Sequence, residues 1–174
     1  MAPPLTLYRA NGACSLVPHI LLRELDIPFT TVLMTFTPNG VEGADGSLSH
    51  AEYLSINPAG FVPALRVGGE EVITELPAIL TYIASLAPEK ELLGSDGLQR
   101  SKVYQWLCWL SGTMHGWAYG MILRPARFTD DAAAHPGVIA KGRKKIEECY
   151  GRIESSLESE HAVGGRFTVV DINM

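Results

Sequence analysis

Residues 5–22, LTLYRANGACSLVPHILL, contain the clearest secondary-structure signals of the chain. The first of these residues, Leu5 to Tyr8, favour a strand, and the Asn11-Gly12 pair that follows favours a turn. Beyond the turn, Leu16 and Ile20 lie four residues apart and begin an apolar pattern with the spacing of a helix face. The stretch therefore predicts a strand, a turn and a helix in that order.

The alternation of strand and helix patterns continues along the first half of the chain. Residues 29–34 are rich in strand formers and predict a second strand, whereas residues 36–50 are dominated by Gly, Asn, Asp and Ser and predict a long surface loop. Residues 63–67 and 71–74 alternate on either side of a glycine pair, which predicts a hairpin. A helix is predicted over residues 78–83. These elements together describe an α/β domain.

The character of the chain changes after residue 86. Proline and glycine residues across 87–97 predict a linker. Between residues 98 and 123, apolar and aromatic side chains recur at spacings of three and four and predict a long helix, which Pro125 would end. Residues 136–160 carry a second amphipathic pattern with Lys and Glu on the opposite face. The second half is therefore expected to be all helical.

The last residues contain the pattern of a helix start. In Thr168-Val-Val-Asp171 the Thr hydroxyl and the Asp carboxylate can satisfy each other's backbone amides, as in a capping box. Only three residues follow, so we expect the helical domain to be truncated. The predicted organisation is an α/β domain over residues 1–86, a linker over 87–97, and an incomplete all-α domain over 98–174.

Composition excludes several classes of protein. The 174 residues are 47% hydrophobic, and the formal net charge of -5 would repel a nucleic acid backbone. The sequence has neither a signal-like N-terminus nor a run of about 18 apolar residues, so we expect a cytoplasmic protein without a membrane partner. Its three cysteines lack metal-ligand or disulfide spacing, so no metal site is expected.

Each cysteine is therefore interpreted separately. Cys14 follows a glycine turn at the start of a predicted helix, where backbone amides and the helix dipole stabilise a thiolate. A free cysteine is also commonly a small buried hydrophobic residue, and the residues alone leave both interpretations open. Cys108 and Cys149 lie on apolar helix faces and are expected in the core.

Four other residues have a structural and a functional interpretation. From spacing alone the bond before Pro63 is expected to be trans, and His115 is expected to be a structural histidine. Glu75 is expected to cap the helix after the hairpin, although it could accept from a ligand ammonium group. Arg124 is expected to be a solvated charge at the end of the long helix, with contact to an anionic ligand as the alternative.

Several motifs together resemble those of a known family. Leu7-Tyr8, the segment Gly12 to His19 and the segment Asn57 to Leu65 are similar, in this order, to the N-terminal domain of glutathione transferases. The similarity is greatest to the bacterial beta class and its fungal relatives, and it covers nearly the whole chain. It implies a thioredoxin-like α/β domain followed by an all-α domain, and also a homodimer.

The resemblance also implies a role for individual residues. Cys14 matches the cysteine next to the glutathione sulfur, Ser15 is the hydroxyl that other classes use, and Tyr8 is a weaker catalytic candidate. Pro63 is implied to be cis, so that the backbone of Val62 pairs with the cysteinyl part of glutathione. The predicted glutathione contacts are Phe61, Val62, Pro63, Glu75 and Leu76. The predicted contacts on the electrophile side are His115, Tyr119 and Arg124.

Two positions depart from the family pattern. Glu75 is followed by Leu76-Pro77 where the family usually has a serine that binds the γ-glutamyl carboxylate, and Cys108 stands where the beta class has an asparagine. Each lost hydrogen bond to a charged group would cost about 1.5 to 3 kcal/mol. Weak glutathione binding therefore stays an alternative, although the backbone amide of Leu76 can still serve as a donor.

The resemblance implies an enzyme that activates the thiol of glutathione for attack on a small apolar electrophile. Conjugation, reversible addition that isomerises a double bond, and thiol exchange through a mixed disulfide on Cys14 share this first step. Glutathione would be a co-substrate or, in isomerisation, a cofactor. The alternatives are a non-catalytic binding module, which Leu76-Pro77 favours, and a fragment that does not fold stably.

Overall fold

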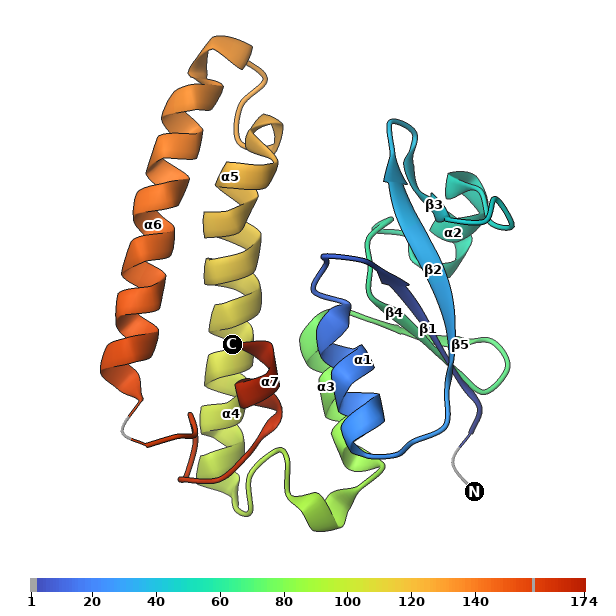
Figure 1. Ribbon diagram of the computed structural model, residues 1–174, viewed down its shortest axis with the longest axis vertical. Helices are drawn as coiled ribbons and strands as arrows, with labels where there is room; N and C mark the ends of the chain where they lie inside the picture. The colour runs from blue at the N-terminus through green and yellow to red at the C-terminus, as the bar shows by residue number, and fades with distance from the viewer. Residues whose placement is uncertain (1–2, 158) are drawn as a thin grey trace. The chain divides into compact units, whose positions relative to one another are not determined.

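The computed structural model describes residues 3–157 and 159–174, which belong to two compact units, Met1–Glu91 and Leu92–Met174 (Figure 1). Met1, Ala2 and Glu158 fall within the predicted domains but lie outside the described residues. The first unit is α/β with a thioredoxin-like arrangement, and the second is helical. The division falls at Glu91, inside the predicted linker, where Pro88–Lys90 forms a short 3-10 helix.

The first unit contains a mixed five-stranded sheet in the order β3-β2-β1-β4-β5. Strand β1 pairs in parallel with β2, and every other pair is antiparallel. The elements are β1 (Leu5–Ala10), α1 (Leu16–Glu24), β2 (Thr30–Thr37), β3 (Gly40–Gly43), α2 (His50–Ile56), β4 (Ala64–Val67), β5 (Glu71–Thr74) and α3 (Leu76–Ser85). The predicted strand–turn–helix unit, the hairpin and the helix after the hairpin are confirmed.

The predicted long loop over residues 36–50 is wrong. Strand β2 continues into this segment and turns back as β3, and α2 then begins behind a capping box formed by Ser49 and Glu52. The glycine at position 40 serves this hairpin, because it has a φ of 130° and a Cβ there would overlap the ring of His50. Glycine is therefore favoured at position 40 both by the turn and by the close approach of the His50 ring.

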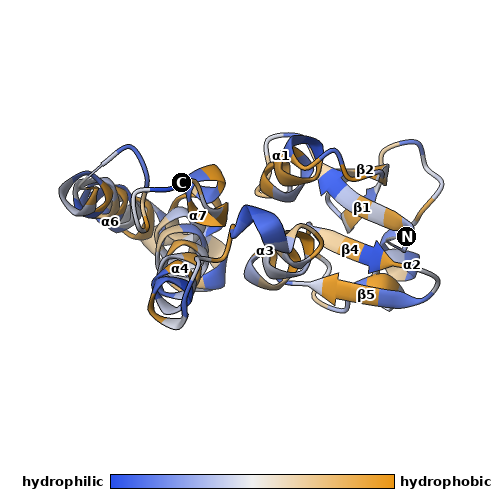
Figure 2. Ribbon diagram, turned by 90° about the horizontal axis from the view of Figure 1, so that it is seen from below, coloured by the Kyte–Doolittle hydropathy of each residue, from blue (hydrophilic) through white to orange (hydrophobic). Residues whose placement is uncertain are grey.

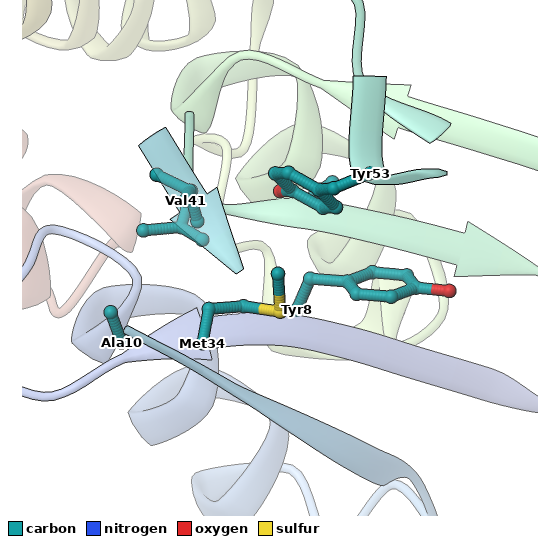
Figure 3. Close-up of a cluster of buried hydrophobic side chains, with 7 residues drawn as sticks. Tyr8, Ala10, Met34, Val41 and Tyr53 are labelled. Carbon is teal, nitrogen blue, oxygen red and sulfur yellow. The ribbon is translucent and has the colours of Figure 1, made fainter. Parts of the chain in front are cut away.

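The two faces of the sheet carry different helices, as Figures 1 and 2 show. Helices α1 and α3 pack together on one face, and hydrophobic residues run through both of them. Helix α2 covers the other face, where a cluster of buried residues lies (Figure 3): Tyr8, Ala10, Met34, Val41, Tyr53, Val62 and Ala64. Successive residues of β1 pack on opposite faces of the sheet, since side chains alternate across a strand.

The second unit begins with a long helical run that ends as predicted before Pro125. It consists of α4 (Gly97–Trp109), a π-helical segment (Leu110–Tyr119) and α5 (Gly120–Leu123). Short 3-10 helices at Pro125–Arg127 and Ala132–Ala134 lead into α6 (His135–Ser156), which packs along the π-helical segment and α5. No described helix of the chain is both long and apolar enough to cross a membrane.

The predicted capping box at the C-terminal end is confirmed. The Asp171 carboxylate accepts from the Thr168 amide at 2.7 Å, and the Thr168 hydroxyl accepts from the Val170 amide at 3.3 Å. The helix that it opens is α7 (Val169–Asn173), whose first two valines are fully buried. This helix contacts α4, so the end of the chain belongs to the core of the second unit.

The two cysteines predicted to lie in the core differ. Cys149 is buried, as expected, but Cys108 is exposed, so the prediction for Cys108 is wrong. The buried stripe of α4 consists of Val103, Trp106 and Leu107. Cys108 follows Leu107 directly, and one step along a helix turns a side chain about 100° away from its neighbour. Cys108 is therefore next to the buried stripe in sequence but faces away from it.

Candidate functional site

The turn between β1 and α1 is closed by the hydroxyl of Ser15. This hydroxyl accepts from the Ala10 amide at 3.0 Å and donates to the Ala10 carbonyl at 3.1 Å, and Ser15 is fully buried. Gly12 has a φ of 69° within the turn, a conformation that glycine adopts without strain. Both hydrogen-bonding functions of the hydroxyl are used, and this favours a positioning role for Ser15 over contact with a ligand sulfur.

Cys14 precedes this helix start and points at a second segment of the first unit. Its half-buried side chain donates from Sγ to the Val62 carbonyl oxygen at 3.6 Å. The Val62–Pro63 peptide bond is cis, as the resemblance implies and against the expectation from spacing alone. The structure thus brings Cys14, Val62 and Pro63 together.

The segment before the cis bond is held by two side chains of α2 and its C-terminal end. The Phe61 carbonyl oxygen accepts from the Tyr53 hydroxyl at 2.7 Å and from the Asn57 side-chain amide at 2.6 Å. Both donors are buried, and burial raises the pKa of Tyr53 to about 12, so its hydroxyl keeps its proton. These contacts fix the backbone that leads into Val62, while the Phe61 ring is exposed.

Sequence reasoning missed Tyr53 and Asn57 as positioning residues. Asn57 lies in the quoted Asn-Pro-Ala-Gly segment, whose composition signals a turn, and its side-chain oxygen does accept from the Ala59 amide at 3.1 Å. That signal could have identified Asn57. Nothing local marks Tyr53, because its partner lies eight residues away across the turn.

Glu75 and Leu76 lie where β5 turns into α3. Glu75 is exposed and has φ 67° and ψ 120°, a backbone conformation that costs a non-glycine residue about 1–3 kcal/mol. Its side chain makes no capping hydrogen bond, so the expectation that it caps α3 is wrong. Pro77 follows in the first turn and supplies no amide proton, which leaves Leu76 as a backbone donor at this helix start.

Tyr8 lies inside the cluster beneath α2 (Figure 3). Its side chain is 5% exposed, and its ring centroid is 5.7 Å from that of Tyr53. The guanidinium carbon of Arg66 lies 5.8 Å from the same ring, within the range of a cation–π contact. This burial favours a structural role for Tyr8.

The three residues predicted for the electrophile side belong to the second unit. His115 and Tyr119 lie in the π-helical segment, and Arg124 follows α5. Partial burial, together with the charges of Arg124 and Arg127, lowers the pKa of His115. The Tyr119 hydroxyl lies 2.7 Å from the Tyr150 hydroxyl on α6, and this hydrogen bond is the main cause that raises the pKa of Tyr119 to about 12.

The geometry in the first unit suits a peptide-like ligand that carries sulfur. The Val62 backbone, which leads into β4, can pair with a peptide backbone, and the Cys14 side chain next to it can donate to a sulfur or another anion. No group of three or more His, Cys, Asp or Glu side chains that could hold a metal ion occurs among the described residues.

Comparison with known proteins identifies the family. Residues 12–86 match the model of the glutathione S-transferase N-terminal domain. The chain is also 32% identical over 167 residues to glutathione S-transferase GstA of Escherichia coli O157:H7, an alignment that covers 95% of this chain and 76% of that protein. The chain belongs to the glutathione S-transferase family. A shorter match, 44% identical over 97 residues, is to maleylacetoacetate isomerase of Pseudomonas aeruginosa and covers 56% of this chain and 42% of that protein.

Solved structures of glutathione transferases support the same assignment. A glutathione transferase homologue from Sulfitobacter with bound glutathione superposes with a TM-score of 0.84 at 27% identity, covering 99% of this chain and 79% of that one. A bacterial beta-class glutathione S-transferase from Sphingomonas chungbukensis has a TM-score of 0.79 at 32% identity, covering 97% and 78% of the two chains. The resemblance to the bacterial beta class is therefore confirmed.

Proposed function

We propose that this glutathione transferase relative is an enzyme that binds glutathione on its first unit and activates the thiol for attack on a small apolar electrophile. The observation that carries the proposal is the contact between Cys14 Sγ and the Val62 carbonyl beside a cis-proline. A thiol donor at this position would lie next to the Val62 backbone, which we infer pairs with the cysteinyl part of glutathione.

Binding would exchange one hydrogen bond for two. The Cys14 thiol, which donates to the Val62 carbonyl in this structure, would turn to the glutathione sulfur. The Val62 carbonyl would then accept from the cysteinyl amide of glutathione. A free thiol with a pKa of about 8.5 is mostly protonated at pH 7, so a donor to its sulfur raises the reactive thiolate fraction.

The remaining parts of glutathione would lie along neighbouring backbone. Phe61, fixed through its carbonyl by Tyr53 and Asn57, and Pro63 would line the cysteinyl portion. Glu75 and the Leu76 amide at the start of α3 would bind the γ-glutamyl group. Since Leu76 has no hydroxyl to offer a carboxylate, we expect modest affinity. Ser15 would act by holding the turn before α1 through its bonds to Ala10, and Tyr8 by packing in the buried cluster beneath α2.

The electrophile would contact the second unit through His115, Tyr119 and Arg124. The lowered pKa of His115 keeps its imidazole largely neutral at pH 7, so the ring can donate one hydrogen bond and accept another. A homodimer, which the resemblance implies, stays a prediction that sedimentation velocity can test.

A second candidate function is glutathione-dependent double-bond isomerisation. The partial match to maleylacetoacetate isomerase favours it. The two functions differ in stoichiometry, because conjugation consumes one glutathione per product whereas isomerisation regenerates it. Measurement of free thiol during turnover of each substrate class separates them.

The proposal is tested by thermal unfolding with and without millimolar glutathione. A ligand that binds only the native state raises its stability, so we expect a higher Tm for the wild-type protein and for Cys108→Ala, whose exposed thiol serves as control. Cys14→Ala should show a smaller increase. Cooperative unfolding without any glutathione-dependent shift in the wild-type protein would contradict the proposal and favour a non-catalytic module on the same fold.

A further inference from the structure

One histidine of the first unit lies between the β2–β3 hairpin and the segment that leads into Val62. His50 is the first residue of α2, and it is half-buried. Its Nδ1 atom lies 3.2 Å from the Val41 amide nitrogen and 3.1 Å from the Val41 carbonyl oxygen. Either neutral tautomer can therefore make one hydrogen bond to Val41, because Nδ1 accepts from the amide or donates to the carbonyl. The ring is thereby tied to β3.

The carbon side of the same ring faces two glycines. A Cβ on Gly40 would overlap the ring, and a Cβ on Gly60 would lie 3.2 Å from its Cε1 atom. The two glycines have φ values of 130° and 67°, which glycine adopts without strain. Gly60 is buried and directly precedes Phe61. The His50 ring therefore fills the space between the hairpin and the start of the segment proposed to bind glutathione.

Gly60 and Phe61 lie along one face of α2 and its C-terminal end. The residues of this face are three, four and seven positions apart, as residues of one helix face are: His50, Tyr53, Leu54 and Asn57. Leu54 Cδ2 would also lie 3.2 Å from a Cβ on Gly60, whereas Tyr53 and Asn57 donate to the Phe61 carbonyl. The Gly60 amide in turn donates to the Asn57 carbonyl at 2.8 Å. All four side chains of the face therefore contact two successive residues.

His50 contributes a contact that the hydrogen bonds to Phe61 do not. Those bonds hold the segment at one carbonyl, while contacts on Gly60 hold it one residue earlier and so limit its rotation. Of the two side chains that contact Gly60, Leu54 is 38% exposed, whereas the His50 ring is bonded to the sheet through Val41. The Val41 side chain lies in the buried cluster of Figure 3. The ring therefore connects Gly60 to the core of the first unit.

We propose that His50 is a positioning residue for glutathione, an inference that rests on the proposed function. Its ring, fixed by β3, would set the position of Gly60 and with it the direction in which the Val62 backbone faces the ligand. Hydrogen bonds weaken steeply as they become misaligned, so a small rotation of this backbone would weaken its pairing with the cysteinyl part of glutathione. His50 itself would touch neither glutathione nor the electrophile.

The test is a calorimetric titration of the full chain with glutathione, for the wild-type protein, His50→Asn and His50→Ala. An asparagine amide can take the place of Nδ1 and keep a hydrogen bond to Val41, but it is too short to reach Gly60. We expect both variants to bind glutathione about five- to tenfold more weakly than the wild-type protein. The Tm should fall further in His50→Ala than in His50→Asn, because only alanine loses the bond to Val41.

His135→Asn is the matched control. His135 is likewise the first residue of a helix, α6, and its Nε2 atom lies 3.1 Å from the Thr129 carbonyl oxygen, but it belongs to the second unit. Since substitutions at independent sites do not couple, the glutathione affinity of His135→Asn should stay within about twofold of the wild-type value.

Hydrogen exchange of the ligand-free proteins tests the contact without glutathione. The Gly60 amide, which donates to the Asn57 carbonyl, should exchange about fivefold faster in both His50 variants and at the wild-type rate in His135→Asn. Wild-type affinity in His50→Asn, or Gly60 exchange that neither His50 variant changes, would overturn the role of His50 alone. A wild-type protein that does not bind glutathione would instead contradict the proposed function, and the role of His50 with it.

Discussion

The two units hold their candidate functional residues in different ways. In the first unit the groups around Cys14 are fixed by buried hydrogen bonds to backbone, from Ser15 to Ala10 and from Tyr53 and Asn57 to Phe61. In the second unit His115 and Tyr119 lie on a π-helical segment, where burial and the charges of Arg124 and Arg127 lower the pKa of His115 and the Tyr150 hydroxyl raises that of Tyr119. A site whose backbone is fixed by buried hydrogen bonds suits a single ligand. Side chains on a helix can instead be substituted one at a time without a change in the backbone.

The largest expected effect is at Ser15. Ser15→Ala would leave the Ala10 amide and carbonyl buried without this partner, at about 1–3 kcal/mol each. We expect the free energy of unfolding, measured by urea denaturation, to fall by about 2–6 kcal/mol. Ser85→Ala, on an exposed turn of α3, should change it by less than about 0.5 kcal/mol. Equal effects of the two substitutions would show that the turn does not depend on this hydroxyl.

In the second unit the comparable substitution is at a close helix contact. Gly142→Ala would overlap Met121 and Ile122 and should lower the free energy of unfolding by about 1–3 kcal/mol. Gly151→Ala is the matched control on the same helix, because a Cβ there meets no atom within 4 Å. It should stabilise the protein by about 0.5–1 kcal/mol, since alanine favours helix over glycine. A stabilising Gly142→Ala would mean that the helices can separate freely.

Tyr53→Phe tests whether the buried donors serve the ligand as well as the fold. Loss of the hydroxyl leaves Asn57 as the other donor to the Phe61 carbonyl, so stability should fall by about 1–2 kcal/mol. Glutathione affinity, measured by calorimetry, should fall several-fold because the Val62 backbone becomes less fixed. Tyr82→Phe on α3 is the control and should leave the affinity unchanged. An unchanged affinity in Tyr53→Phe would confine this tyrosine to a structural role.

The smallest expected effect is a pH dependence at His115. Its folded pKa lies below the ordinary value of about 6.5, so the unfolded chain binds the proton more readily. The stability that the neutral imidazole contributes is complete above pH 6.5 and is lost as the pH falls through the lowered value. His115→Gln should therefore lose less stability than the wild-type protein between pH 7.5 and pH 5, as measured by Tm. Parallel curves would show that His115 is solvated like a free imidazole.

The sequence predicted the parts of the fold that depend on neighbouring residues. The turn before Cys14, the hairpin around Gly68-Gly69 and the capping box at Thr168 each need only a few adjacent residues. The segment from residue 36 to 50 was predicted wrongly because the role of Gly40 depends on His50, which comes from α2. Its composition alone did not distinguish a tight hairpin from an open loop.

The candidate site was predicted in part for the same reason. Cys14 and Val62–Pro63 stand in motifs and could be paired through the family resemblance. Tyr53 could not be identified in this way, because its hydrogen bond to the Phe61 carbonyl spans a turn whose path the sequence does not specify. The exposure of Cys108 depends on which face of α4 packs against its neighbours, which the apolar spacing did not predict.

If the Cys14 thiol donates to the sulfur of glutathione, removal of this thiol should change the pKa of bound glutathione. Thiolate absorbance near 240 nm is followed against pH, as the difference between the complexes with glutathione and with S-methylglutathione. We expect a bound pKa below the free value of about 8.5 in the wild-type protein and in Cys108→Ala, and a higher value in Cys14→Ala. A bound pKa that equals the free value, or that Cys14→Ala leaves unchanged, would contradict it.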